Sequence, residues 1–154
     1  MKGALVTGAG TRIGRAIALA LAEDGWFVFV HHLASATEAR ATVAEIARGG
    51  GKAKAVKADL SSARQAEALV GKCRAKGVTL TCLVNNASLF RLDRAPTATA
   101  ALFDAHMAVN LRAPMLLSQA LARQLPERET GLIVNLLDQK LFNLNPDFLT
   151  YTLS

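Results

Sequence analysis

The sequence lacks several features that would mark a specialised class of protein. Its 154 residues include only two cysteines, Cys73 and Cys82, which form no C-x-x-C pair, so a disulfide scaffold is excluded. The three histidines do not have the spacing of zinc ligands, and no metal is expected. No apolar run is long enough to cross a bilayer, and the first residues show no signal-peptide core. We therefore expect a cytoplasmic protein in a reducing compartment, with no membrane partner.

Aromatic residues are also scarce, at 5% of the chain, and the formal net charge of +6 comes from scattered lysines and arginines. Nucleic-acid binders usually cluster their basic residues and interleave them with aromatics, so no nucleic-acid partner is expected. An anionic small molecule explains the positive charge equally well. With 51% hydrophobic and 19% charged residues, the chain has enough apolar material for the core of one globular domain.

Short apolar segments alternate with helical patterns along the chain. Strands are predicted at residues 2–6, 26–30, 54–58, 80–84 and 131–137. The first helix is expected to bury positions 13, 16, 17, 20 and 21, and a long helix over about residues 99–125 is expected to kink at Pro114. Alternating strands and helices with short connections predict an α/β fold, a Rossmann-type doubly wound parallel sheet with helices on both faces.

A glycine-rich turn joins the first predicted strand to the first helix. It reads Thr7-Gly8-Ala9-Gly10-Thr11-Arg12-Ile13-Gly14. Gly8 permits a tight turn, Gly14 lets the helix pack closely on the sheet, and the helix N-terminus offers free N–H groups to a phosphate. The spacing departs from G-x-G-x-x-G, because the third glycine comes one residue late. Its place between strand and helix favours a dinucleotide site over a purely structural turn.

The end of the second predicted strand lacks the acidic residue that holds the ribose 2′-hydroxyl in NAD binders. No Asp or Glu occurs there before Glu38. Such a site does not repel a 2′-phosphate, and Arg12, His31 and Ser35 could donate hydrogen bonds to it. Alternatively, the two adjacent histidines only end the strand. The pattern predicts NADP(H) rather than NAD(H) as the cofactor.

Polar residues follow the later strands in an order that is typical of one enzyme family. Asp59 follows the third strand, Asn85-Asn86-Ala87-Ser88 the fourth, and Asp138 the fifth. Asn110 lies on the long helix, and Tyr151 comes thirteen residues after Asp138. With the glycine turn, these motifs resemble the short-chain dehydrogenase/reductase family over essentially the whole chain. The resemblance implies that Tyr151, Asp138 and Asn110 are catalytic. The cofactor-binding residues that it implies, together with those argued above, are Gly8, Thr11, Arg12, Ile13, Gly14, His31, Ser35, Asp59, Leu60, Asn86, Ala87 and Ser88.

Departures from the family pattern indicate a subgroup. Arg12 replaces the middle glycine of T-G-x-x-x-G-x-G, and Asp138 stands where the family usually has its catalytic serine. Both are similar to pteridine reductases and dihydromonapterin reductases, in which an aromatic residue at the position of Phe90 stacks on the pterin. Phe90 could instead be a loop residue that packs on the core. The resemblance implies Arg12, Ser88, Phe90, Asp138 and Tyr151 as substrate-binding residues.

Reduction of a carbonyl or imine requires a hydride and a proton. Tyr151 is the only tyrosine in the chain, and the family's lysine, four residues later, would lower its pKa. Asp138 could relay a proton with Tyr151, anchor the amino-pyrimidine edge of a pterin, or simply begin a helix. Asn110 could hold a relay water or form a structural hydrogen bond.

Three functions stay open at this point. The leading one is an NADPH-dependent reductase of a pteridine-like ring, and the second is a carbonyl reductase acting on ketones or 3-oxoacyl groups. The third is a nucleotide-binding module without catalysis. The resemblance implies a homo-oligomer with a small-molecule substrate. Residues 1–154 are expected to form a single NADP-binding domain that stops before the fold is complete, leaving the fifth strand as an exposed apolar edge.

Overall fold

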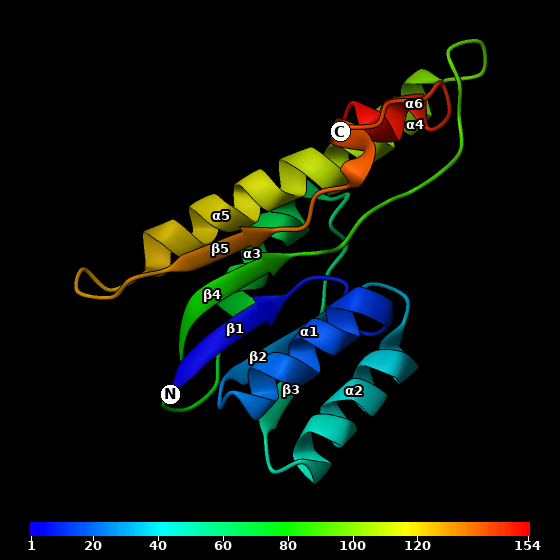
Figure 1. Ribbon diagram of the computed structural model, residues 1–154. Helices are drawn as coiled ribbons and strands as arrows, with labels where there is room; N and C mark the ends of the chain where they lie inside the picture. The colour runs from blue at the N-terminus through cyan, green and yellow to red at the C-terminus, as the bar shows by residue number, and fades with distance from the viewer.

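Five parallel strands form one sheet at the centre of the computed structural model, which describes residues 1–154 (Figure 1). The sheet has the order β3-β2-β1-β4-β5, which reverses between β1 and β4. The strands are β1 (Lys2–Val6), β2 (Phe27–His32), β3 (Lys52–Lys57), β4 (Thr79–Asn85) and β5 (Leu132–Asn135). This arrangement confirms the predicted Rossmann-type fold, in which ligands bind at the carboxyl ends of the strands where the order reverses.

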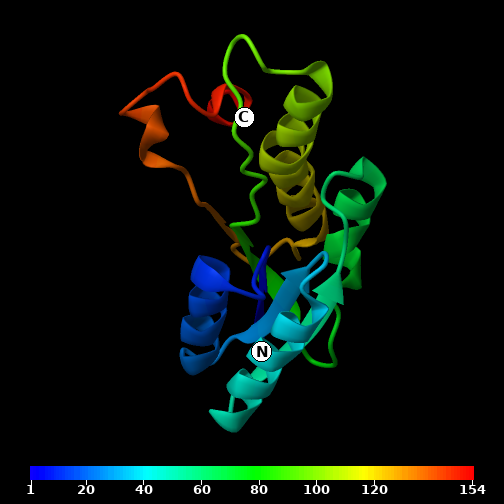
Figure 2. The same ribbon diagram turned by 90° about the vertical axis from the view of Figure 1, so that its right-hand side faces the viewer.

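Helices cover both faces of the sheet, as expected. On one face lie α1 (Arg12–Glu23) and α2 (Ala36–Arg48), and on the other lie α3 (Ala63–Lys72) and α5 (Ala113–Gln124) (Figure 2). Two shorter helices, α4 (Ala100–His106) and α6 (Leu149–Thr152), contact each other beyond the carboxyl end of the sheet (Figure 1).

Successive residues of each central strand face opposite sides of the sheet. In β1, Leu5 packs with α3 and α5, whereas its neighbours Ala4 and Val6 pack with α1 and α2. All three are fully buried. A strand with helices on both faces has no solvent-facing side, so its sequence is a continuous apolar run rather than an alternating one.

Helix α1 buries different residues from those that its spacing predicts. Its buried positions are Gly14, Ala18 and Ala22, whereas Ile13 is 60% exposed. Small side chains occupy the fully buried positions because α1 packs close to the sheet and to α2. The predicted Ile17 and Leu21 are partly buried and pack against the same core from its margin. Ile13 lies instead at the open end of the helix, beside the glycine turn.

The long helix is interrupted before Pro114 rather than kinked at it. A π-helix spans Met107–Arg112, and Pro114 lies in the first turn of α5. The N–H of Ala113 bonds to the carbonyl of Ala108, five residues back. Pro114 has no N–H to continue the ladder, so one bond is missing where the π-helix passes into α5. Arg112 and Ala113 keep helical backbone dihedrals, and the helix runs on.

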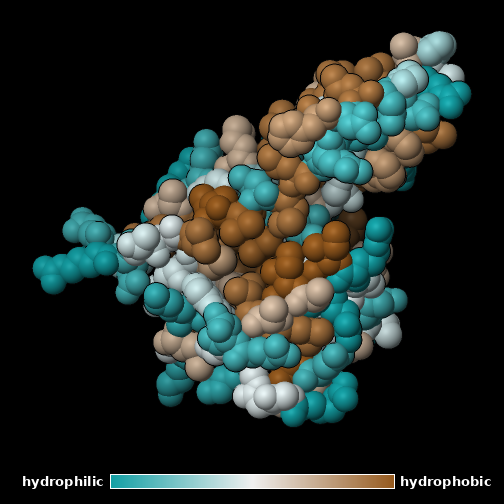
Figure 3. All heavy atoms as spheres, in the orientation of Figure 1, coloured by the Kyte–Doolittle hydropathy of each residue, from teal (hydrophilic) through white to brown (hydrophobic).

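The two edge strands differ in character. At one edge, β3 exposes Lys52, Lys54 and Lys57, and charge of this kind discourages pairing with another strand. At the other edge, β5 is exposed along its whole length, as predicted, and apolar atoms gather on that face (Figure 3). The strand is shorter than the predicted 131–137, because the chain leaves the sheet at Asn135. None of the helices has both the length and the apolar character needed to cross a membrane.

Candidate functional site

A cleft of about 480 Å³ opens at the carboxyl ends of β1 and β4, where the strand order reverses. Its volume lies within the range of small-molecule sites. Five separate segments line it, namely the glycine turn, the loops that follow β2, β4 and β5, and helix α6. The lining residues are Gly8, Thr11, Arg12, Ile13, Gly14, Ser35, Asn86, Ala87, Ser88, Phe90, Asp138 and Tyr151. The fold thus brings together most of the residues that the sequence singles out.

Hydrogen bonds between the loops after β1 and β4 fix the glycine turn. The hydroxyl oxygen of Thr7 accepts bonds from the N–H groups of Asn86 and Ala87, both at 2.9 Å. In return, the side-chain amide of Asn86 donates to the carbonyls of Thr7, at 2.8 Å, and Gly8, at 3.3 Å. Gly8 has a φ of +64°, which glycine adopts without strain. Asn86 therefore holds the turn in shape as well as lining the cleft.

The N-terminus of α1 is open to an anion. N–H groups in the first turn of a helix have no intrahelical acceptor, and the helix dipole is positive there. The N-cap residue Thr11 makes no side-chain capping bond, and the first turn holds no acidic residue. These features fit a phosphate of a dinucleotide, held by backbone N–H groups.

Arg12 begins this helix in a left-handed conformation, with a φ of +51°. That conformation costs a non-glycine residue about 1–2 kcal/mol, whereas the glycine that the resemblance in the sequence implies at this position would adopt it without strain. The strain brings a cationic side chain to the rim of the cleft beside the free N–H groups. Unfavourable backbone geometry of this kind is typical of functional sites.

His31 does not have the predicted role of donor to a 2′-phosphate. Its ring is only 2% exposed, and both nitrogens are used. Nδ1 accepts from the N–H of Gly8 at 3.1 Å, and Nε2 lies 3.1 Å from the carbonyl of Ala58, to which it donates in this tautomer. Burial lowers the pKa of His31 to about 4, so the ring is neutral. His31 supports the glycine turn from behind, and Arg12 and Ser35 are the predicted donors that line the cleft.

Tyr151 and Asp138 form a hydrogen-bonded pair at the rim of the cleft. The Tyr151 hydroxyl donates to Oδ2 of Asp138 at 2.9 Å, and Oδ1 accepts from the backbone N–H of Lys140 at 2.9 Å. Both residues also line a smaller pocket of about 130 Å³, which contains Asn110 as well. The pair therefore stands between two hollows and can face a bound molecule.

The surroundings of this pair separate the two pKa values. The backbone hydrogen bond from Lys140, followed by the bond from Tyr151, lowers the pKa of Asp138. Burial, together with the hydrogen bond and charge of Asp138, raises the pKa of Tyr151 to about 12. The lowered pKa expected from the sequence depends on a lysine four residues after Tyr151, outside residues 1–154, and stays a prediction. With the groups of residues 1–154 alone, the phenol keeps its proton at neutral pH and can act as a proton donor.

Asn110 clamps the backbone that follows β4. Its Oδ1 accepts from the N–H of Leu89 at 2.8 Å, and its amide nitrogen donates to the carbonyl of Leu89 at 3.0 Å and to Ser154 Oγ at 2.9 Å. Both N–H donors of the amide are thus used. These bonds agree with the structural hydrogen-bonding role that the sequence left open for Asn110. A proton relay through Asn110 stays a prediction.

Asp59 and Leu60 lie in the connection between β3 and α3 and do not line the cleft. Oδ1 of Asp59 accepts from the backbone and the hydroxyl of Ser61, at 2.9 and 2.7 Å, and these bonds lower the pKa of its carboxyl group. Leu60 is buried in the core with α3 and α5. Contact of Asp59 with an adenine ring stays a prediction.

Phe90 is exposed and stacked rather than packed into the core. It is 53% exposed, and its ring centroid lies 4.1 Å from that of Phe148, with an angle of 11° between the planes. The Tyr151 ring is nearly perpendicular to that of Phe90, at 80°, with a centroid distance of 4.6 Å. The alternative of a core-packing loop residue is therefore wrong. Phe90, Phe148 and Tyr151 thus form a half-exposed aromatic cluster at the cleft.

The sequence did not indicate Phe148 or the role of Lys140. The Lys140 ammonium donates to Oδ1 of Asn145 at 2.7 Å and to the carbonyl of Asp147 at 2.9 Å, and it lies 5.3 Å from the centre of the Phe148 ring. These contacts fold the loop after β5 back towards α6. No local pattern could have revealed them, because they depend on the path of an irregular loop.

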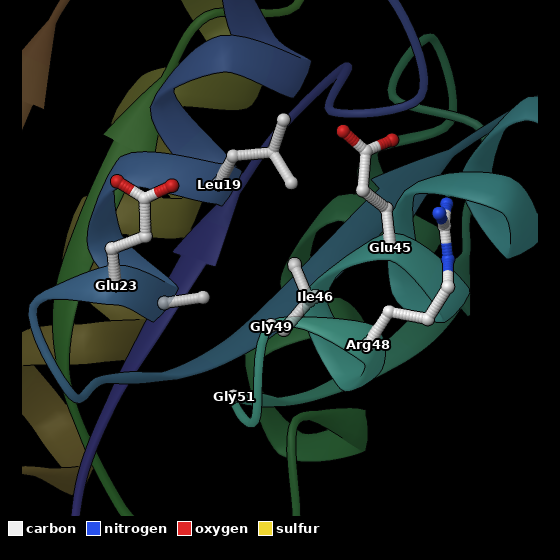
Figure 4. Close-up of a pocket in the computed structure, with 8 residues that line it drawn as sticks. Leu19, Glu23, Glu45, Ile46, Arg48, Gly49 and Gly51 are labelled. Atoms are coloured by element: carbon white, nitrogen blue, oxygen red, sulfur yellow. The ribbon is translucent and has the colours of Figure 1, made fainter.

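A separate hollow of about 350 Å³ lies between the C-terminal ends of α1 and α2 (Figure 4). Glu23, Glu45 and Arg48 surround it, and Glu45 forms an ion pair with Arg15. In a parallel α/β fold, helix C-termini lie at the amino ends of the strands, opposite the ligand-binding edge. This hollow is therefore a poor candidate for the functional site.

Comparison with known proteins shows the family to which the chain is similar along nearly its whole length. A family model described as short chain dehydrogenase matches residues 2–154. A 3-oxoacyl-[acyl-carrier-protein] reductase from a Synechocystis species is 36% identical over 133 residues, which are 86% of this chain and 54% of that protein. The crystal structure of FolM alternative dihydrofolate reductase 1 from Brucella suis in complex with NADP has a TM-score of 0.92 and 41% identity, covering 99% of this chain and 63% of that one.

A second solved structure, the angucycline C-6 ketoreductase LanV with bound NADP, has a TM-score of 0.90 and 34% identity. The match covers 100% of this chain and 64% of that one. The chain thus spans about half the length of the Synechocystis relative and less than two thirds of either solved structure.

Proposed function

This chain belongs to the short-chain dehydrogenase family, and we propose that it carries the cofactor site and a reactive tyrosine of an NADPH-dependent reductase. The observation that carries the proposal is the Tyr151–Asp138 pair, which lies on the same cleft as the glycine turn. We further propose that residues 1–154 act as one dinucleotide-binding unit that assembles into homo-oligomers.

The chemistry of the cleft supports a phosphorylated dinucleotide. Backbone N–H groups at the start of α1 would hold the pyrophosphate, and Arg12 and Ser35 would bind a 2′-phosphate. Relatives crystallised with NADP, such as the Brucella FolM protein and LanV, point in the same direction.

The proposed reaction needs a donor of one proton beside the reacting bond. When bound, the nicotinamide supplies the hydride to the carbon of a C=N or C=O group. Tyr151 gives its phenolic proton to the nitrogen or oxygen that becomes negatively charged. Asp138 is ionised and accepts the phenolic hydrogen bond, which orients the hydroxyl before the substrate arrives.

We propose a pteridine-like ring as the substrate. Phe90 is half-exposed next to Tyr151 with Phe148 stacked on its ring, and we propose that a planar heterocycle stacks on the ring surface that Phe148 leaves open. The Asp138 carboxylate can accept charge-assisted hydrogen bonds from an amino-pyrimidine edge. The name of the Brucella relative, an alternative dihydrofolate reductase, agrees with this choice.

A carbonyl reductase is the second candidate. Two relatives favour it by name, a 3-oxoacyl-[acyl-carrier-protein] reductase and a ketoreductase. Because a ketone or a thioester lacks an amino-pyrimidine edge, Asp138 would have no partner in such a substrate. A nucleotide-binding module without catalysis is the third candidate, and the Tyr151–Asp138 geometry argues against it.

Replacing Asp138 by serine tests the substrate class. We expect NADPH-dependent reduction of a dihydropterin to fall about 10²-fold, because the variant loses both the substrate anchor and the orientation of the phenol. The affinity for NADPH, measured by titration calorimetry, should be unchanged. The Tyr151 phenol, followed by its ultraviolet absorbance, should titrate closer to its ordinary pKa of 10 than to about 12. Unchanged dihydropterin turnover would remove the pteridine proposal, and a gain on ketones would favour the second candidate.

The cofactor preference can be tested by titrating NADPH and NADH separately into the full-length protein. We expect NADPH to bind at least tenfold more tightly, a difference of about 1.4 kcal/mol, because Arg12 and Ser35 line the cleft and no acidic residue follows β2 before Glu38. His31→Asn should leave the preference intact, because His31 is buried behind the turn. Equal affinities for the two cofactors would contradict the proposal.

A further inference from the structure

A buried polar cluster lies directly behind Tyr151, and the reaction proposed above does not use it. Its members are Asp93 in the loop after β4, His106 at the end of α4, and Thr150 in α6. Their exposures are 3%, 0% and 3%, respectively. Polar and charged groups at such depth are costly unless their hydrogen bonds are satisfied.

Thr150 is at the centre of the cluster. Its N–H donates to Oδ1 of Asp93 at 3.1 Å, and its hydroxyl donates to Oδ2 of the same carboxylate at 2.5 Å. The hydroxyl proton is therefore directed towards Asp93. The hydroxyl oxygen remains free to accept from His106, whose Nδ1 lies 2.7 Å away.

These partners assign the tautomer of His106. Nδ1 carries the proton and donates to Thr150, while Nε2 accepts from the backbone N–H of Arg91 at 3.2 Å. Burial lowers the pKa of His106, the charge of Asp93 opposes this, and Arg91 adds to it. A neutral ring has one donor and one acceptor, and both are used here.

The His106 ring therefore links the loop that carries Phe90 to the helix that carries Tyr151. On one side it holds the backbone of Arg91, the residue after the aromatic surface of Phe90. On the other side it holds Thr150, the residue before Tyr151. The Asp93 backbone carbonyl adds a third tie, because it accepts from the N–H of Phe148 at 2.8 Å. Helix α6 has only four residues, and so short a helix needs tertiary contacts of this kind.

We propose that His106, Thr150 and Asp93 are positioning residues that hold the Tyr151 hydroxyl in register with the Phe90 ring. The inference rests on the proposed reductase function for its kinetic consequences, but its geometric content does not depend on it. An apolar cluster of similar volume would hold α6 as firmly, at less desolvation cost. The directional bonds of the polar cluster instead fix one orientation of the helix.

Two substitutions at His106 test its two hydrogen bonds, to Thr150 and to Arg91, separately. The amide of asparagine reaches the position of Nδ1, so His106→Asn retains a donor to Thr150 and loses the acceptor for Arg91. The longer glutamine reaches the position of Nε2, so His106→Gln retains the acceptor for Arg91 and loses the donor to Thr150. A merely space-filling role for the ring predicts no such difference.

We expect His106→Gln to lower kcat by about 10- to 100-fold, because the phenol loses its orientation. The KM for the dihydropterin should change little in that variant. His106→Asn should mainly raise KM, because the Phe90 loop is released. If both variants change kcat and KM equally, or change neither, the proposal is overturned.

Substitutions at Thr150 provide a second test should the His106 variants fold poorly. Thr150→Val removes the hydroxyl at constant volume and should lower kcat, and Thr150→Ser should restore it. Thr81→Val is the matched control, because Thr81 is equally buried, at 2% exposure, and its hydroxyl has no hydrogen-bond partner. Equal losses in Thr150→Val and Thr150→Ser would contradict a positioning role for the hydroxyl.

A readout that needs no substrate separates this proposal from the reductase function. The Tyr151 phenol is titrated by ultraviolet absorbance, and the spectrum of Tyr151→Phe is subtracted. A midpoint near 12 in the wild type should fall towards 10 in His106→Gln and Thr150→Val, but not in Thr81→Val. If the wild type reduces no substrate but these shifts occur, the function fails and the positioning role stands. If the midpoint stays fixed in every variant, the positioning role fails.

Discussion

Replacing Tyr151 by phenylalanine is expected to lower NADPH-dependent turnover by about 10²- to 10⁴-fold, the contribution of a well-placed general acid. The substitution removes only the hydroxyl, which donates to Asp138, and retains the ring that meets Phe90 edge-on. Packing and cofactor affinity should therefore be preserved. Steady-state kinetics with a dihydropterin and with a ketone, together with calorimetric titration of NADPH, measure the two effects.

The outcome distinguishes the candidates for function. Loss of turnover with intact NADPH binding supports the proton-donor role of Tyr151. Wild-type turnover in the variant would assign the proton to another group, and the Tyr151–Asp138 pair would then be structural. If the wild type also shows no turnover on either substrate class, while NADPH binds, the nucleotide-binding module becomes the better description.

The same substitution predicts a pH effect on stability. The folded pKa of Tyr151 is raised to about 12 from an ordinary value of 10. A raised pKa means that folding favours the protonated phenol, so this stabilisation is complete below pH 10 and is lost as the pH rises towards about 12. The free energy of unfolding in urea should therefore fall for the wild type, relative to Tyr151→Phe, as the pH rises across that range. A constant difference would contradict the raised pKa.

Replacing Gly14 by alanine is expected to have the second large effect. A methyl group there would lie 2.4 Å from the carbonyl oxygen of Gly8 and 2.5 Å from the side-chain nitrogen of Asn86. Neither neighbour can yield easily, because the first is backbone and the second is held by its bonds to the glycine turn. The turn must therefore shift, which costs about 1–3 kcal/mol of stability, as in other overpacked sites.

Cofactor binding should suffer more than stability in this variant. The N–H groups at the start of α1 are aimed by the turn that the methyl group displaces, so we expect NADPH affinity to fall at least tenfold, about 1.4 kcal/mol. Gly71→Ala is the matched control. Gly71 lies in α3 with no atom within 4 Å of the added carbon, and alanine should stabilise that helix by about 0.5–1 kcal/mol. Wild-type NADPH affinity in Gly14→Ala would place the cofactor elsewhere.

Local sequence patterns determined much of this protein. The apolar runs of the strands, the glycine turn and the polar residues after each strand predicted the sheet, and twelve of the singled-out residues line one cleft. The prediction of the cleft residues succeeded because a parallel sheet places the carboxyl ends of all its strands at one edge. Residues that follow different strands therefore meet, whatever the details of the loops.

Only the tertiary structure decided what lies behind and around that edge. It turned His31 from a phosphate donor into a buried support, placed small residues rather than Ile13 in the contact of α1, and put a π-helix ahead of Pro114. It also joined Asp93, His106 and Thr150, which come from three different elements. Periodicity reports which face of an element is apolar, whereas the hydrogen-bond partners of a buried polar group depend on how distant segments pack together.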